Sequence, residues 1–330
     1  MTTPFKPLNK EQLKHGCKRW LAEVWMIFWS LVKIMVPILF VVRFIELMGW
    51  VDNLAALIEP IMVWVGLPGE MGLVWMSAMV SSIYTGMAVF YQLGGAEQLT
   101  VAQISVLGTM ILLAHALPME VAIAKATGVS LWFTLTLRIG GALVLGALLH
   151  FVYDHYSLLQ TPIPLLWQPE LSGSDWASWF IAQFNMLLAA LVIIAGLTLF
   201  IRILRLLGVE KLIHWLLAPV LRALGIGAKA TNIMIVGLTL GISFGGGLLI
   251  QEARSGKISG KDIFMTMAFL GLCHSLIEDT LLILLLGADA SAVLWARLGF
   301  SLLVIAILAR VLNALPKNKK HWLYRLPSET

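Results

Sequence analysis

The dominant feature of the sequence is a series of long apolar runs separated by short polar segments. A helix needs about 20 apolar residues to cross the ~30 Å hydrocarbon core of a bilayer. Two shorter segments, 51–66 and 209–225, carry polar residues near one helical face, so each either spans the membrane or lies in its interface. The pattern predicts an all-α polytopic membrane protein with eight to ten spanning helices. The long runs cover residues 24–48, 70–91, 103–125, 130–152, 179–203, 231–251, 262–285 and 290–313.

Composition supports this class. Hydrophobic residues make up 59% of the chain and charged residues 12%, whereas a soluble domain is about 25% charged. The mean hydropathy is +0.89. The net charge of +5 comes from Lys and Arg that lie mostly at the flanks of apolar runs, so it indicates membrane topology and not a nucleic-acid partner. The lipid bilayer is therefore the first predicted partner, and the two cysteines give no disulfide framework.

The two halves of the chain repeat one another. A shift of 159 residues aligns them without a gap, and polar residues, prolines and glycines match in one register, which predicts a duplicated fold. The matched pairs are Gly49 and Gly208, Pro60 and Pro219, Gly86 and Gly245, Gln92 and Gln251, His115 and His274, Glu120 and Asp279, Gly128 and Gly287, and Arg138 and Arg297. The predicted parts are a basic amphipathic N-terminal segment (1–23), repeat 1 (24–152), an external loop (153–178), repeat 2 (179–313) and a basic tail (314–330).

Basic residues predict the orientation of the chain. Both terminal segments are rich in Lys and Arg, which places both ends in the cytoplasm of a bacterial inner-membrane protein. The loop 251–262 contains three basic residues, and its counterpart 92–103 contains none. Equivalent loops of opposite charge bias face opposite sides of a membrane, so inverted repeats of about five helices each are favoured. A parallel arrangement follows if 51–66 and 209–225 are interfacial.

Two apolar runs carry ionisable residues at mid-depth, in "HALPME" (115–120) and "HSLIED" (274–279). His115 lies about 18 Å into its run, near the middle of the bilayer, and His274 has the same depth. Pro118 interrupts the helix after His115. His274 and Glu278 are spaced i, i+4 and Asp279 lies beside them, which predicts a shared face. Buried charges in a membrane mark pathways or relays. These five residues, His115, Glu120, His274, Glu278 and Asp279, are the predicted substrate- or ion-binding groups.

The runs that precede these motifs carry a second polar signal at similar depth, in "MVSSIYTGMAVF" and "LTLGISFGGGLLI". The three successive glycines favour either close helix packing or local unwinding. Arg138 and Arg297 either pair with Glu120 or Asp279 inside the bundle or attract an anionic substrate. The further candidate lining residues are Ser82, Tyr84, Thr85, Ser243, Gly245, Gly246 and Gly247. Inverted repeats with broken helices place a transport site at the midplane.

A Ser/Gly-rich helix followed by a His-x-Leu-x-x-[Glu/Asp] helix, present twice, resembles the nucleoside recognition, or Gate, domain family. That family includes the spore maturation proteins A and B and the membrane part of the ferrous-iron transporter B. The resemblance covers roughly residues 25–313 and implies two fused Gate units. The chain contains neither a GTP-binding loop nor a cysteine in its Ser/Gly-rich runs, which argues against iron transport.

These observations favour a secondary transporter, coupled to protons or cations, for a nucleoside-like or other small polar or anionic solute. A membrane scaffold is the main alternative, and it predicts a packed midplane without a cavity. A divalent-cation permease is the second, and it predicts that His115 and His274 lie close enough to share an ion, with Glu278 as a further metal candidate. No enzymatic activity and no cofactor are expected, and an intramembrane hydrolase is the least favoured reading. A homo-oligomer is compatible with the sequence.

Overall fold

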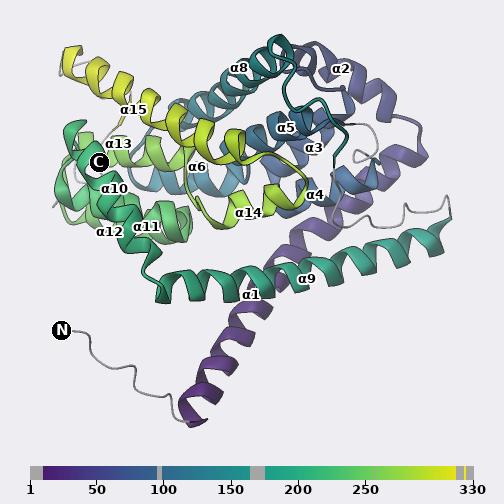
Figure 1. The fold of residues 1–330 in the computed structure, drawn as a ribbon, viewed down its shortest axis with the longest axis horizontal. Coiled ribbons are helices and arrows are strands. Elements are labelled where there is room, and N and C mark those ends of the chain that lie inside the picture. Colours follow the sequence, from purple (N-terminus) through teal and green to yellow (C-terminus); the bar gives the residue numbers. More distant parts are fainter. Residues whose placement is uncertain (1–9, 95–98, 164–174, 257, 317–322, 325–330) are drawn as a thin grey trace.

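The computed structural model describes residues 10–94, 99–163, 175–256, 258–316 and 323–324. Its named elements are all helical, in agreement with the predicted all-α membrane fold (Figure 1). Repeat 1 contains α1 (Lys10–Leu47), α2 (Val51–Trp64), α3 (Glu70–Val80), α4 (Ile83–Gln92), α5 (Val101–Leu113), α6 (Leu117–Ala126), α7 (Leu131–Leu135), the π-helix η2 (Thr136–Gly140) and α8 (Gly141–His155). Repeat 2 contains α9 (Trp176–Leu206), α10 (Val209–Ala223), α11 (Ala228–Leu240), α12 (Ile242–Arg254), α13 (Gly260–Leu272), α14 (Glu278–Leu285), the π-helix η3 (Ser291–Ala296) and α15 (Arg297–Ala314).

Five helices are long and apolar enough to cross a membrane by length and composition. They cover His15–Leu47, Val101–Ala126, Leu131–His155, Trp176–Leu206 and Ser291–Ala314. Three other predicted spans are each divided between two short helices: 70–91 between α3 and α4, 231–251 between α11 and α12, and 262–285 between α13 and α14. The all-α prediction with broken helices is therefore confirmed, although hydropathy alone does not locate a break of a few residues.

Two predicted boundaries differ from the structure. α1 begins at Lys10 and continues without interruption to Leu47, so residues 10–23 are the first turns of the long helix and not a separate segment. The described part of the predicted external loop begins within α8, which ends at His155, and resumes at residue 175, directly before α9. Residues 164–174 of that loop and most of the predicted basic tail lie outside the described residues.

The centre of the fold is formed by α5 and α13. All but two residues of α5 and nearly all of α13 are buried, as expected for helices that are apolar on every side. The most apolar window of the α5–α6 span is 78% buried, against 17% for the corresponding windows of α1 and α9. α1 and α9 pack against each other at the edge of the molecule, where they cross below the other helices in Figure 1. Their exposed apolar side chains suit contact with lipid.

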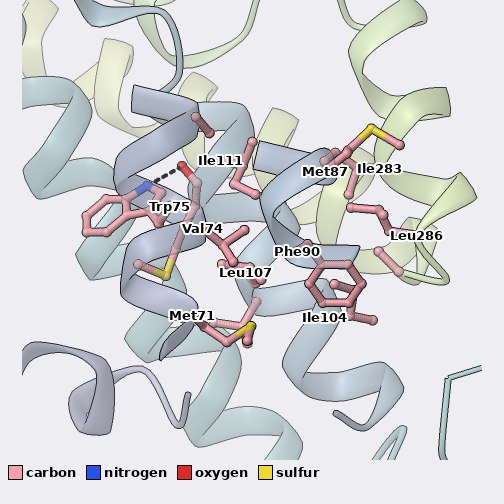
Figure 2. Close-up of a cluster of buried hydrophobic side chains, with 14 of the residues drawn as sticks. Met71, Val74, Trp75, Met87, Phe90, Ile104, Leu107, Ile111, Ile283 and Leu286 are labelled. Carbon is pink, nitrogen blue, oxygen red and sulfur yellow. Dashed lines mark hydrogen bonds between the residues drawn. The ribbon is translucent and has the colours of Figure 1, made fainter. Parts of the chain in front are cut away.

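The core of repeat 1 is a cluster of large apolar side chains from several helices (Figure 2). Leu107 and Ile111 of α5 lie between Val74 of α3 and Ile283 of α14, so the core also joins the two repeats. Trp75 is buried and its indole Nε1 donates a hydrogen bond of 3.2 Å to the carbonyl of Met110. This bond satisfies the polar atom of an otherwise apolar side chain.

The glycine run in α12 serves packing and not unwinding. α12 is continuous through Gly245, Gly246 and Gly247. A Cβ atom at Gly245 would lie 2.5 Å from the Cα of Gly237 in α11, and one at Gly246 would lie 2.5 Å from Ile123 in α6. Gly247 faces open space. The backbone break instead occurs at Gly241, where φ is +89°.

We expect Gly245→Ala to destabilise the protein by about 1–3 kcal/mol, because the added methyl group would force α11 and α12 apart. Gly247→Ala is the matched control. It places the same methyl group in open space, and replacing a helical glycine by alanine stabilises a helix by roughly 0.5–1 kcal/mol. Unfolding of the two variants in detergent, followed by intrinsic tryptophan fluorescence, would compare them. Equal stability of both variants would contradict close packing at Gly245.

Candidate functional site

The candidate site lies where two central helices are interrupted. α5 ends at Leu113 and α6 begins at Leu117, and the intervening Ala116 has φ +48°. α13 ends at Leu272 and α14 begins at Glu278, and Ser275, the equivalent of Ala116, has φ +44°. A left-handed conformation is uncommon for residues other than glycine and marks local strain. Its presence at both equivalent positions shows that the two breaks are the same structural feature.

The breaks leave helix-terminal carbonyls that need donors, since the ends of α5 and α13 are buried. In repeat 1, His115 Nδ1 lies 3.0 Å from the Ile111 carbonyl, and Arg138 Nε donates to the Leu113 carbonyl at 2.8 Å. Repeat 2 makes the same two contacts. His274 Nδ1 lies 2.7 Å from the Leu270 carbonyl, and Arg297 Nε donates to the Leu272 carbonyl at 3.1 Å. Both histidines and both arginines therefore cap the interrupted helices.

Backbone hydrogen bonds link the breaks at α5–α6 and α13–α14 to the ends of α3 and α11, where two further helices are interrupted. The amide of Ala116 donates to the carbonyl of Ala78 near the end of α3 at 3.0 Å. In repeat 2, the amide of Leu276 donates to the carbonyl of Leu238 near the end of α11 at 2.7 Å. α4 resumes after Ser82, whose side chain accepts from the amide of Thr85 at 3.3 Å. In each repeat, one such backbone bond therefore joins the break after the central helix, α5 or α13, to the end of α3 or α11.

The histidines of the two repeats meet at this place. Nε2 of His115 lies 3.2 Å from Nε2 of His274, and the ring centroids are 4.9 Å apart. Both side chains are buried, with exposed fractions of 7% and 3%. The contact joins equivalent atoms of equivalent residues in the two repeats. The sequence predicted both residues as binding groups, and the divalent-cation permease alternative predicted that they lie close enough to share an ion, which is the arrangement that the structure contains.

Two carboxylates complete the cluster, and they differ in their partners. Glu120 forms an ion pair with Arg138 through one oxygen, and its Oε1 lies 3.3 Å from Nε2 of His274. Asp279 Oδ2 lies 3.7 Å from Nε2 of His115 and 3.8 Å from Nε2 of His274, and it has no hydrogen-bond partner. Because aspartate is one methylene shorter than glutamate, Asp279 does not form the counterpart of the ion pair between Glu120 and Arg138.

Both arginines stabilise the protein around the site and do not line the cavity. Arg138 and Arg297 are fully buried, and neither lines a cavity that reaches the histidines. Arg138 pairs with Glu120, as one of the two sequence-based interpretations predicts. Arg297 instead donates to two carbonyls, those of Leu272 and His274, and its Nη1 has no hydrogen-bond partner.

The helical spacing that was expected to bring Glu278 onto the face of His274 does not apply. Residues 273–277 are not helical, so the i, i+4 geometry is lost and Asp279 faces the histidines instead. Glu278 is half-buried and lines the adjoining cavity. It is the equivalent of Met119, which also lines that cavity.

A cavity of about 500 Å³ leads to the histidine pair. One wall is formed by α1, through residues that include Met26, Ser30 and Ile34, and α1 packs against α4. The inner end is lined by His115, Glu120, His274, Ser275, Glu278 and Asp279, together with Ser81, Ser82, Tyr84 and Gly241. A second cavity, of about 530 Å³ between the α7–α8 segment and α15, is lined almost wholly by apolar side chains and does not reach the cluster.

The remaining predicted lining residues divide into three groups. Tyr84 and Ser82 line the cavity, whereas Thr85 is fully buried and bonds to the hydroxyls of Ser81 and Ser82. Gly245 and Gly246 are packing positions, and Gly247 lies on the exposed side of α12. The side chain of Ser243 lies outside what the structure describes.

Sequence analysis missed Ser275 and the α1 wall of the cavity. Gly241 belongs to the glycine-rich signal in "LTLGISFGGGLLI", but local unwinding was expected at the three later glycines and not at Gly241. The contribution of α1 has no comparable signal, because its lining residues are ordinary apolar residues apart from Ser30.

Comparison with known proteins supports the membrane assignment. The chain is 26% identical over 296 residues to the uncharacterized membrane protein YvoD of Bacillus subtilis (strain 168). The aligned region covers 88% of this chain and 92% of that protein. No protein-family profile and no solved structure matches the chain. The chain is thus similar over nearly its full length to another membrane protein, in agreement with its helical fold and its five candidate membrane spans.

Proposed function

We propose that this protein is a membrane transporter whose translocation site is the histidine–carboxylate cluster at the inner end of the cavity beside α1. The observation that carries this proposal is the cavity of about 500 Å³ lined by His115, His274 and Asp279. Buried ionisable groups are costly in a membrane protein, so those that are present commonly mark a substrate or ion pathway, and these groups can be reached from the cavity.

The arrangement of the helices supports the proposal. Transporters built from repeats place their sites near the bilayer midplane, on helices that are interrupted there. Here the interruptions between α3 and α4, α5 and α6, α11 and α12, and α13 and α14 all lie at the cluster. A scaffold protein would not require a cavity at the two histidines, although it accounts equally well for the ion pair between Arg138 and Glu120.

The repeats pack differently around the site, which also suits a transporter. α1 packs against α4 of its own repeat and forms a wall of the cavity, whereas its equivalent α9 packs against α1 and α10. Two repeats with the same sequence pattern but different packing can exchange their conformations, and such an exchange would open the site to the opposite side. The asymmetry between the repeats thus provides a route to alternating access.

Further properties belong to the same proposal. We assign the chain to the Gate family as two fused units, arranged as inverted repeats in a bacterial inner membrane with both termini in the cytoplasm. The substrate is a small solute or an ion, no cofactor is needed, and no bond of the substrate is broken. The protein is not an enzyme under this proposal.

Cysteine accessibility tests alternating access without knowledge of the substrate. Met119 lines the cavity and is 50% exposed, so Met119→Cys places a thiol on its wall. We expect a membrane-impermeant thiol reagent to label this cysteine both in right-side-out and in inside-out vesicles. The background is Cys17→Ser, with the fully buried Cys273 retained.

Two controls complete the experiment. The background protein measures any labelling of Cys273. Leu303→Cys places a thiol in the apolar cavity next to α15, where lipid excludes a charged reagent from either side. Labelling of Met119→Cys from one side alone, in vesicles of proven orientation, would contradict alternating access and favour the scaffold.

A further inference from the structure

The protonation of the two histidines follows from their backbone partners. A carbonyl oxygen can only accept a hydrogen bond, so Nδ1 of each ring carries the proton that bonds to Ile111 or Leu270. In the neutral ring the opposite nitrogen, Nε2, then presents a lone pair. The lone pairs of His115 and His274 therefore face each other across 3.2 Å, which is unfavourable unless a positive species lies near both.

Asp279 places a third acceptor, its Oδ2 atom, next to the two Nε2 atoms. Its Oδ2 is 3.7 Å from one Nε2 and 3.8 Å from the other, it has no hydrogen-bond partner, and the residue is 8% exposed. The point equidistant from the three atoms lies about 2.1 Å from each of them. Zinc binds imidazole nitrogen at ~2.0–2.1 Å and carboxylate oxygen at ~2.0–2.2 Å. The three atoms are thus already spaced as ligands of one such cation.

The groups around these three atoms also suit a metal site. The hydrogen bond from each Nδ1 to a carbonyl fixes the ring orientation, as is usual for metal-binding histidines. Glu120 is tied to Arg138, and its Oε1, 3.6 Å from Nε2 of His115, adds negative charge next to the ion. Three protein ligands next to a cavity leave a coordination position open, in contrast to the closed four-ligand sites that hold structural zinc.

We propose that His115, His274 and Asp279 bind a divalent transition-metal cation of the zinc class, and that this cation is the species the transporter moves. Imidazole and carboxylate ligands suit Zn²⁺ and its divalent neighbours, whereas Cu⁺ prefers sulfur ligands and Mg²⁺ an oxygen shell. The identity of the cargo rests on the proposed transport function, but binding at this site does not.

The first experiment measures binding to the full-length protein, purified in detergent without a histidine tag and treated with a chelator. We expect one equivalent of Co²⁺ to produce the visible absorption of a four-coordinate site and Zn²⁺ to displace it, while Mg²⁺ has no effect. X-ray absorption of the zinc-loaded wild type should show two imidazole ligands. This measurement needs no variant, so a folding defect cannot obscure it.

Variants locate the site. His115→Ala, His274→Ala and Asp279→Asn should each weaken zinc binding by at least tenfold, since each removes one ligand. The control His214→Ala, which removes a half-buried histidine bonded to Asn232, should retain wild-type affinity. A proton shared between the two rings, in place of a metal, predicts no cobalt spectrum and would overturn the proposal.

Flux in proteoliposomes tests the cargo. A zinc-sensitive dye trapped inside should report entry into vesicles with the wild type and not with the three ligand variants. Binding without flux would overturn the assignment of the metal as cargo. The thiol-labelling experiment on Met119→Cys remains a separate test. Labelling from both sides without metal binding would leave the transporter in place with another substrate, whereas metal binding with labelling from one side would exclude transport.

Discussion

Replacement of Arg138 by alanine is expected to destabilise the protein by about 3–5 kcal/mol, enough to prevent accumulation of folded protein in the membrane. Arg138 is fully buried, pairs with the buried carboxylate of Glu120, and donates to the carbonyl of Leu113 at the end of α5. Its loss leaves a buried charge without a partner and a helix-terminal carbonyl without a donor. Unfolding in mixed micelles with increasing denaturing detergent would measure the change in free energy.

Arg297→Ala is the matched comparison, because Arg297 is its repeat equivalent and is also fully buried. It donates to the carbonyls of Leu272 and His274, and among the described residues it makes no ion pair within 4.0 Å. We therefore expect a smaller loss than for Arg138→Ala. The double change Arg138→Met with Glu120→Gln should recover part of the loss, since it removes both charges. Equal destabilisation by the two alanine variants would contradict the special status of the pair with Glu120.

Replacement of Asp279 by glutamate is expected to lower zinc affinity and zinc flux on the order of 100-fold, although the charge is retained. The longer side chain can reach Arg297, whose Nη1 lacks a hydrogen-bond partner, as Glu120 reaches Arg138 in the other repeat. The carboxylate would then leave the point that it shares with the two histidines. Cobalt absorption and vesicle flux of the purified variant would measure the effect.

Two further exchanges make this prediction specific. Glu278→Asp makes a one-methylene change at the neighbouring carboxylate, which lines the cavity without facing the histidines, and should lower zinc affinity far less than Asp279→Glu does. Glu120→Asp shortens the side chain that holds Arg138, so it should reduce stability more than affinity. An Asp279→Glu variant that binds zinc as tightly as the wild type would show that side-chain length does not select the ligand.

Much of the fold could be predicted from the sequence because membrane insertion is governed by hydropathy. The apolar runs located the helices, and the shift of 159 residues paired His115 with His274 and Arg138 with Arg297. In the structure the members of each pair occupy equivalent helix ends and make equivalent bonds to equivalent carbonyls. The sequence repeat predicts a structural repeat because each of these side chains has the same local role in both halves. Each one donates a hydrogen bond to a carbonyl that has lost its partner within the helix.

The partners of these residues could not be predicted, and the reason is geometric. The assignment of Glu278 assumed a continuous helix after His274, and the break at Ser275 turned Asp279 toward the histidines instead. The glycine run suggested unwinding, but only the position of α11 next to Gly245 identifies it as a packing surface. The α1 wall of the cavity consists mostly of apolar residues that have no distinctive pattern.

The sequence by itself determined that this is a helical membrane protein, that its two halves share one pattern, and that a histidine and a carboxylate recur at equivalent positions of both halves. Hydropathy and internal repetition depend on local composition, so a single chain suffices to detect them. Only the tertiary structure decided that His115 and His274 meet at 3.2 Å and that Asp279, not Glu120, is left without an arginine. The contact between the histidines joins residues 159 positions apart, and the carboxylate partners depend on a difference of one methylene group and on two strained residues at the helix breaks.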